Sequence, residues 1–210
     1  MADPARKISV SAQASAVAVA EKSGPHYANP QLPMGFEANQ GQFTDDIKFR
    51  ARGAGYSVLL RSTEAVLQLG GTVAPKPGDV LKERKLAAGR GRHRVPPVQW
   101  SESAVLRLSL VDANADAGIS GEAQAEGTAN YFIGNDPALW RTSVPVFEKV
   151  RYRGVYPGVD LLYYGNQRQL EYDFVVAPNA NPEQIQLRLE GVDRLSVDAS
   201  GDLIAHLGCN

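Results

Sequence analysis

The chain has 210 residues, a formal net charge of −1, 43% hydrophobic residues and 21% charged residues, which are ordinary values for a globular protein. This near-neutral balance excludes a global field that would attract nucleic acid, so we expect no nucleic-acid partner. No apolar run approaches the ~18 residues of a membrane-spanning helix, so we expect no transmembrane segment. The single cysteine, Cys209, excludes an internal disulfide.

Residues 1–33 are expected to form a flexible leader, because they lack periodicity and end in Pro30-Gln31-Leu32-Pro33. Arg6 and Lys7 precede a stretch from Ile8 to Ala20 that ends in an A-x-A pattern, as a signal peptide would. Serines and a glutamine make the centre of this stretch too polar for the apolar region that a signal needs. The sequence therefore contains no clear signal peptide.

Residues 34–210 are expected to form one β-rich domain. Apolar residues alternate with polar ones in Tyr56–Leu60 and Ala65–Leu69, which predicts a hairpin with one buried face. Residues 71–103 break the pattern with four prolines and seven lysine or arginine residues, which is typical of a disordered basic loop inserted between two strands. A basic patch for an acidic partner is the alternative. Alternation resumes from Leu106 to Leu110.

The clearest strand pattern predicts a hairpin of Asp160–Tyr164 and Gln169–Val176, with Gly165-Asn166 in the tight turn. Ile185–Leu189 alternates as well, and Leu195–Ile204 predicts a last hairpin close to the end of the chain. Many short strands separated by turns, with no long helix, favour an antiparallel all-β fold that resembles a β-sandwich. The position of the last hairpin fits a domain truncated at its C-terminus.

The segment Val111–Gly121 is expected to be turn-like, and its Asp112-Ala113-Asn114-Ala115-Asp116 run imitates the start of a calcium-binding loop. Such a loop needs glycine at its sixth position and a bidentate glutamate at its twelfth, where this chain has Ala117 and Ala123. We therefore interpret the run as a turn between strands. The sequence predicts no metal site and no cofactor.

Glu171 and Asp173 lie two residues apart on one predicted strand, so their side chains share a face at roughly 6–7 Å. That spacing falls within the range of the paired carboxylates of glycosidases. Alternating acids on a strand are more commonly its solvated face, however, and the chain has neither a G-x-S-x-G motif nor a glycine-rich phosphate loop. We therefore expect no catalytic residues and no enzymatic activity.

Ten aromatic residues gather between Tyr131 and Phe174. Most are expected to fill the core, but tyrosine and tryptophan also form contact surfaces and stacking platforms for sugars. The candidate ligand-binding residues are Trp140, Arg141, Tyr163 and Tyr164. Trp140 is expected to be the exception to core packing, because it follows a turn and precedes an arginine.

Several ordered motifs carry a family likeness: Phe36-Glu37-Ala38-Asn39-Gln40-Gly41-Gln42, then Ile47-Lys48-Phe49 and Ala51-Arg52-Gly53, Asn130–Asp136 with Trp140-Arg141-Thr142, Val150–Asp160, and Leu170-Glu171-Tyr172-Asp173-Phe174. Over about residues 34–205 the chain resembles the N-terminal domain of unknown function that precedes SBBP-type β-propeller repeats in bacterial surface or secreted proteins. The resemblance implies an extracellular or cell-surface location and partners such as neighbouring β-propeller or Ig-like modules, or a surface glycan or protein. It brings no established active site.

These observations together predict a non-catalytic structural or interaction domain of a bacterial exported or cell-surface modular protein. The alternative is a carbohydrate-binding module that uses exposed aromatic side chains, with Trp140, Tyr163 and Tyr164 as platforms.

Overall fold

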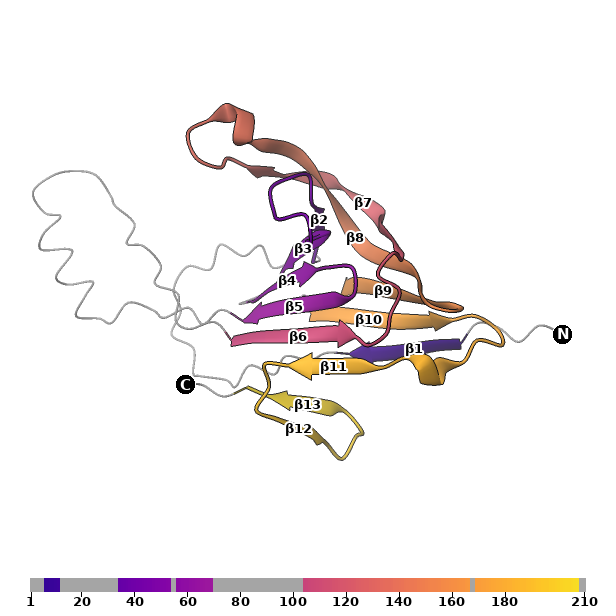
Figure 1. Ribbon diagram of the computed structural model, residues 1–210. Coiled ribbons are helices and arrows are strands. Elements are labelled where there is room, and N and C mark those ends of the chain that lie inside the picture. Colours follow the sequence, from indigo (N-terminus) through magenta and orange to yellow (C-terminus); the bar gives the residue numbers. More distant parts are fainter. Residues whose placement is uncertain (1–5, 12–33, 54–55, 70–103, 167–168, 208–210) are drawn as a thin grey trace, which may run out of the picture.

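The protein is described by a computed structural model that covers residues 6–11, for which only the backbone is described, 34–53, 56–69, 104–166 and 169–207. One antiparallel sheet of eleven strands forms most of the molecule, and a separate two-stranded sheet lies at the C-terminal side (Figure 1). The predicted all-β, mainly antiparallel fold class is confirmed. The structure shows one continuous curled sheet, and the expected β-sandwich detail is not confirmed.

The strands are short except for two that pair with each other, β7 and β8. Their bounds are β1 (Arg6–Ser11), β2 (Phe36–Ala38), β3 (Phe49–Arg52), β4 (Tyr56–Leu60), β5 (Glu64–Leu69), β6 (Ala104–Leu110), β7 (Gly118–Tyr131), β8 (Arg141–Tyr156), β9 (Val159–Asn166), β10 (Gln169–Val176), β11 (Leu187–Glu190), β12 (Arg194–Val197) and β13 (Leu203–His206). Two single turns of 3-10 helix, η1 (Pro137–Leu139) and η2 (Pro182–Gln184), complete the described elements. Within the described part of the chain, no helix has the length and apolarity needed to cross a membrane.

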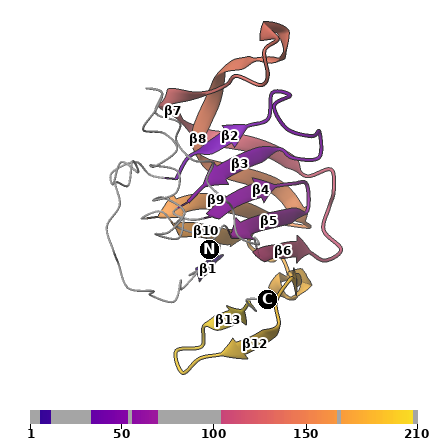
Figure 2. The same ribbon diagram turned by 90° about the vertical axis from the view of Figure 1, so that its left-hand side faces the viewer.

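Strand β8 is shared by two arms of the sheet. Along one edge it pairs with β7, and along the other edge it pairs first with β2, at Val146 and Phe147, and then with β9, from Lys149 onward. One arm therefore continues as β9–β10–β1, and the other as β2–β3–β4–β5–β6–β11. In both views the strands β3 to β6 lie over β9 and β10 (Figures 1 and 2).

The core lies between these two arms, because the alternating apolar residues of both point into it. Side chains from β4, β8, β9 and β10 that are almost fully buried include Val58, Leu60, Val150, Tyr152, Leu161, Tyr163, Tyr172 and Phe174. Tyrosine hydroxyls complete the contact between the arms: Tyr152 donates to the carbonyl of Arg61 at 2.8 Å, and Tyr56 accepts from the Leu170 amide at 3.1 Å. Core packing of most aromatic residues is thus confirmed.

The predicted hairpins β4–β5, β9–β10 and β12–β13 are confirmed, but the position of the β9–β10 turn is not. Gly165 and Asn166 belong to β9 and pair with Leu170 and Gln169. Gly165 serves a close approach instead, because a Cβ atom there would lie 2.5 Å from the Cβ of Met34. Glycine is therefore needed at position 165 for close packing against Met34, and not for a tight turn.

The structure differs from the sequence prediction at two further places. Gly118–Gly121, expected to be turn-like, begins the 14-residue strand β7, whose partner β8 has 16 residues. Arg6–Ser11, expected to be leader, forms β1 at the edge of β10. The rest of the expected leader, the basic loop 71–103 and Cys209 lie outside the described residues.

We expect Phe36→Ala to lower the free energy of unfolding by about 3–5 kcal/mol, because it leaves a cavity in the core. Phe36 is fully buried and pairs across β2 with both Ala51 and Phe147. Urea denaturation measures the effect. The matched control is Phe132→Ala, at an exposed position, which should change stability by less than about 0.5 kcal/mol. Equal effects of the two substitutions would contradict the burial pattern.

We also expect stability to fall as the pH rises above about 10. Burial raises the pKa of Tyr172 to about 12, and it also raises the pKa values of Tyr152 and Tyr163 well above the usual range. The unfolded chain releases these protons near pH 10. Stability is therefore fully present below that pH and is lost between about 10 and 12, by ~1.4 kcal/mol per pH unit for each such tyrosine. Urea unfolding at several alkaline pH values measures this loss. Tyr172→Phe should make the dependence shallower, and a flat profile to pH 12 would contradict it.

Candidate functional site

The β7–β8 hairpin ends in a cluster of exposed apolar side chains, which we call the apolar tip and define as Phe132, Ile133, Leu139 and Trp140. These residues are 65%, 44%, 53% and 36% exposed, respectively. Figures 1 and 2 show the hairpin rising away from the rest of the sheet, with η1 at its end. The tip therefore projects beyond the core instead of contributing to it.

Hydrogen bonds within the loop give the tip a defined shape. Asp136 caps η1, since its carboxylate accepts from the Ala138 amide at 2.9 Å. The Trp140 indole donates to the carbonyl of Gly134 at 3.3 Å, and Gly134 adopts a φ of 66°, which glycine tolerates readily. The Phe132 and Trp140 rings meet edge to face with centroids 5.2 Å apart.

Arg141 ties the tip to a second loop, far away in sequence. Its guanidinium donates to the carbonyls of Ala138 and Trp140 at the end of the hairpin and to the carbonyl of Gln40 in the 39–47 loop, at 3.2, 3.1 and 3.0 Å. Gly41 has a φ of 95°, and a Cβ atom there would lie 3.2 Å from Nε of Arg141. Glycine thus allows the two loops to approach.

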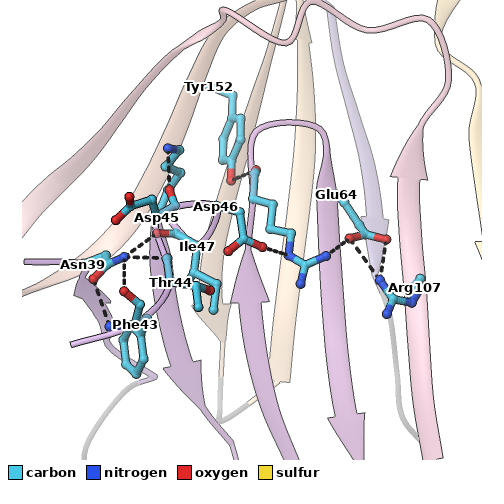
Figure 3. Close-up of polar contacts among 11 residues, drawn as sticks. Asn39, Phe43, Thr44, Asp45, Asp46, Ile47, Glu64, Arg107 and Tyr152 are labelled. Carbon is cyan, nitrogen blue, oxygen red and sulfur yellow. Dashed lines mark hydrogen bonds and ion pairs between the residues drawn. The ribbon is translucent and has the colours of Figure 1, made fainter. Parts of the chain in front are cut away.

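Asn39 organises the 39–47 loop (Figure 3). Its side-chain amide donates to the carbonyls of Thr44 and Ile47 at 2.9 and 2.8 Å, while its side-chain oxygen accepts from the amides of Gly41 and Phe43 at 3.0 and 3.2 Å. One half-buried side chain therefore satisfies backbone groups from both ends of the loop. The loop is held in the shape that Arg141 contacts.

A second anchor lies where β7 enters the tip. The Tyr131 hydroxyl donates to the carboxylate of Glu37 on β2 and accepts from Arg52 on β3 at 3.4 Å. The Tyr131 ring also meets Phe43 edge to face, with centroids 5.5 Å apart. Burial, together with the bond to Glu37, raises the pKa of Tyr131. The base of the hairpin is thus fastened to the β2–β3 arm by polar and aromatic contacts.

Beyond the loop, charged side chains form a chain along the ends of β4 to β6 (Figure 3). Arg61 pairs with Asp46 at 2.9 Å and with Glu64 at 2.8 Å, and Glu64 also contacts Arg107 at 3.2 Å. A hydrogen bond from Thr44, followed by the charge of Arg61, lowers the pKa of Asp46. This chain joins the 39–47 loop to the β4–β5 turn, so we assign it to the support of the loop.

The structure brings two of the four candidate ligand-binding residues together and separates the other two from them. Trp140 and Arg141 lie side by side at the apolar tip. Tyr163 is only 3% exposed and packs against Tyr152 in the core. Tyr164 is half-buried on the opposite face of β9. A ligand at the tip would therefore not reach Tyr163 or Tyr164.

Tyr164 belongs to a polar group on the outer face of β9 and β10. Burial raises its pKa, and hydrogen bonds to Glu171 and Asp173 raise it further. Glu171 also accepts from the Asn166 side chain at 2.9 Å, whereas Asp173 is completely buried. The two carboxylates share a face, as their spacing indicates, but only Glu171 is accessible to solvent.

The segment with the calcium-like spacing forms a turn. The Asn114 side chain donates to the carbonyl of Gly154 at 3.2 Å and accepts from the Asp116 amide at 3.0 Å. These bonds occupy the central oxygen of the run within the protein. Among the described residues, no group of three or more His, Cys, Asp or Glu side chains lies close enough to hold a metal ion.

Sequence reasoning identified Trp140 but missed the other members of the tip, Phe132, Ile133 and Leu139. Their signal was present, because two apolar pairs flank the turn-forming run Gly134–Pro137. Without β7 and β8 as strands, nothing indicated that both pairs would lie at the end of one hairpin. The support from the 39–47 loop was also missed, because it connects positions about 100 residues apart.

We expect Asn39→Ala to destabilise the protein by about 1–3 kcal/mol, because it leaves half-buried backbone groups without partners. Asn39→Asp should cost at least as much, since it replaces the donating amide by an oxygen that faces carbonyls. Urea denaturation and amide exchange of residues 40–47 provide the measurements. As a control, Asn135→Ala, at an exposed position in the loop between β7 and β8, should change the free energy of unfolding by less than about 0.5 kcal/mol. Unchanged exchange in the loop of Asn39→Ala would refute the role of this side chain.

Two motifs of the family likeness meet at this site: Phe36–Gln42 contains the start of the 39–47 loop, and Asn130–Asp136 with Trp140–Thr142 contains Phe132, Ile133 and Trp140 of the tip. Comparison with known proteins gives a consistent result: the family model for "Domain of unknown function (DUF7948)" matches residues 36–210. No curated protein and no solved structure matches the chain. The match spans most of the chain and nearly all of its strands, and the chain therefore belongs to the DUF7948 family of domains of unknown function.

Proposed function

We propose that this DUF7948 domain is a non-catalytic interaction domain that binds a protein partner through its apolar tip. The observation that supports the proposal is the exposure of Phe132, Ile133, Leu139 and Trp140 together at the end of a projecting hairpin. Fully burying one such side chain contributes roughly 1.5–3 kcal/mol. Contiguous exposed apolar groups of this kind commonly mark protein contact sites.

The tip is also held in place before any partner arrives. Arg141 and Asn39 fix the loops, and Tyr131 fastens the base of the hairpin to β2 and β3. A preformed contact element loses less conformational entropy on binding than a mobile loop does. This arrangement supports recognition as the role of the tip.

The charged residues beside the tip, Asp136 and Arg141, leave an apolar surface as the favoured partner. The Asp136 carboxylate caps η1, and the Arg141 guanidinium donates to three carbonyl groups. Both charged groups thus already make hydrogen bonds within the protein. Burial of the four apolar side chains is therefore the main contribution that the tip can make to the free energy of binding. We propose a hydrophobic pocket or groove on a protein module as its partner.

We further propose that the domain belongs to a bacterial exported or cell-surface protein and that its partner is a neighbouring module, such as a β-propeller or Ig-like module, or another surface protein. The resemblance of residues 34–205 to domains that precede SBBP-type repeats supports this context. The motifs Phe36–Gln42 and Asn130–Asp136 with Trp140–Thr142 lie at or beside the tip, so part of the likeness falls where we place the contact.

Carbohydrate binding is the second candidate, and the aromatic pair of Phe132 and Trp140 favours it. Sugar rings stack on exposed aromatic faces, and Phe132 is 65% exposed. Trp140 offers less, because its ring packs edge to face with Phe132 and its indole N–H donates to the carbonyl of Gly134. The protein-partner proposal therefore takes precedence.

The test places a photo-cross-linking amino acid at Phe132 or, as the matched control on the same hairpin, at exposed Glu126, in the parent protein in its own cells. We expect a specific product with a protein or a neighbouring module from position 132 alone. Ile133→Ser with Leu139→Ser should abolish it, and the same changes should not alter unfolding by urea. Products from both positions, or from neither, would refute the proposal. A glycan array that binds the wild-type domain but not Trp140→Ala would favour the carbohydrate alternative instead.

A further inference from the structure

The edge of β10 is completed by a strand that comes from outside the family domain. β1 pairs with β10 in antiparallel register over six positions, from Arg6 opposite Val176 to Ser11 opposite Glu171. The family match begins at residue 36, and residues 12–35 separate β1 from β2. The matched domain therefore has a strand edge at β10 that a separate segment fills.

A strand edge of this kind pairs readily with another extended segment. β9 occupies one side of β10 along its whole length, from Gln169 to Val176. Without β1, the other side would present a row of unpaired amide and carbonyl groups, which pair readily with any extended chain. Main-chain hydrogen bonds of this kind are the source of affinity in recognition by strand addition.

The two faces of β10 define what kind of strand fits. Tyr172 and Phe174 are buried in the core, and the positions opposite them are Val10 and Ile8. Glu171 and Asp173 lie on the other face, where the opposite positions are Ser11 and Ser9. The next position along that face, opposite Val175, is a lysine.

We propose that the β10 edge is a binding site for an extended peptide, and that β1 is its occupant within the same chain. The site favours a particular sequence pattern. Two apolar residues with one residue between them fit the core face of β10, as Ile8 and Val10 do. The residues that alternate with them carry a small hydroxyl or a basic group, which suits the acidic face. A strand of the same pattern from another polypeptide takes the place of β1. This site is separate from the apolar tip and does not depend on the function proposed for it.

Attachment in the same chain gives β1 an advantage over a free peptide. A segment tethered through residues 12–35 acts at a high effective concentration, so the intact protein should bind added peptide only weakly. Weakening β1 itself should expose the site. The difference between the two cases isolates strand exchange at β10 from nonspecific peptide binding.

The experiment uses the full chain with Ile8→Asp and Val10→Asp, which places charges at the two core-face positions of β1. The matched control is Val17→Asp with Val19→Asp, which introduces the same two aspartates at the same spacing outside β1. The probe is a fluorescein-labelled peptide of residues 4–13, followed by fluorescence anisotropy. We expect the β1 variant to bind it at least about tenfold more tightly than the control variant does.

Peptide variants test the register. Ser9→Asp in the peptide places a carboxylate opposite Asp173, so we expect weaker binding, because like charges across a strand pair repel. A scrambled peptide should not bind. Equal binding of all three peptides, or equal binding by the two protein variants, would overturn the proposal.

A milder change keeps the test valid if the double aspartate variant does not fold. Ile8→Ala with Val10→Ala shortens the side chains of β1 without adding charge. Circular dichroism and urea unfolding establish that this chain is folded. A folded alanine variant that binds the wild-type peptide no better than the control variant would overturn the proposal as well.

Discussion

The whole structure depends on one strand, β8, whose single edge serves two partners in succession. Val146 and Phe147 pair with β2, and from Lys149 onward the same edge pairs with β9. Because both arms of the sheet start from this edge, they face each other and enclose the core between them. The alternation of side chains along β8 then decides which residues reach the core, among them Val150 and Tyr152, which are almost fully buried.

The same strand explains why the apolar tip is both exposed and fixed. β8 leaves the core at its N-terminal half, still paired with β7, and carries the tip away from both arms (Figure 1). A two-stranded ribbon is only marginally stable alone, so its base needs support. Tyr131 and Arg141 supply this support through contacts with the β2–β3 arm and the Asn39 loop. The family motifs 36–42 and 130–136 with 140–142 thus belong to one structural unit.

Sequence reasoning found the fold class and the hairpins whose apolar and polar residues alternate, such as Tyr56–Leu69 and Asp160–Val176. It missed β7 and most of β8 as strands, because Val144 is the only buried residue in the outer part of this hairpin, among the residues that the structure describes, and the sequence there lacks alternation. The burial pattern of β7 contains no fully buried residue. Gly165 was assigned to a turn because its close approach to Met34 joins segments about 130 residues apart, which the local sequence does not reveal. Of the candidate site, Trp140 and Arg141 were found, whereas the placement of Tyr163 and Tyr164 required the registers of β8, β9 and β10.

Amide hydrogen exchange of the intact protein tests most directly whether β8 is one continuous element that holds the tip to the core. The account predicts that amides of β8 from Val144 to Tyr152 exchange as slowly as those of β9, through opening of the whole domain. Amides of the tip between Phe132 and Leu139 should exchange faster. If the outer half of β8, around Val144, instead exchanged as rapidly as the tip while Tyr152 remained protected, the hairpin would open independently. That result would contradict the central place of β8.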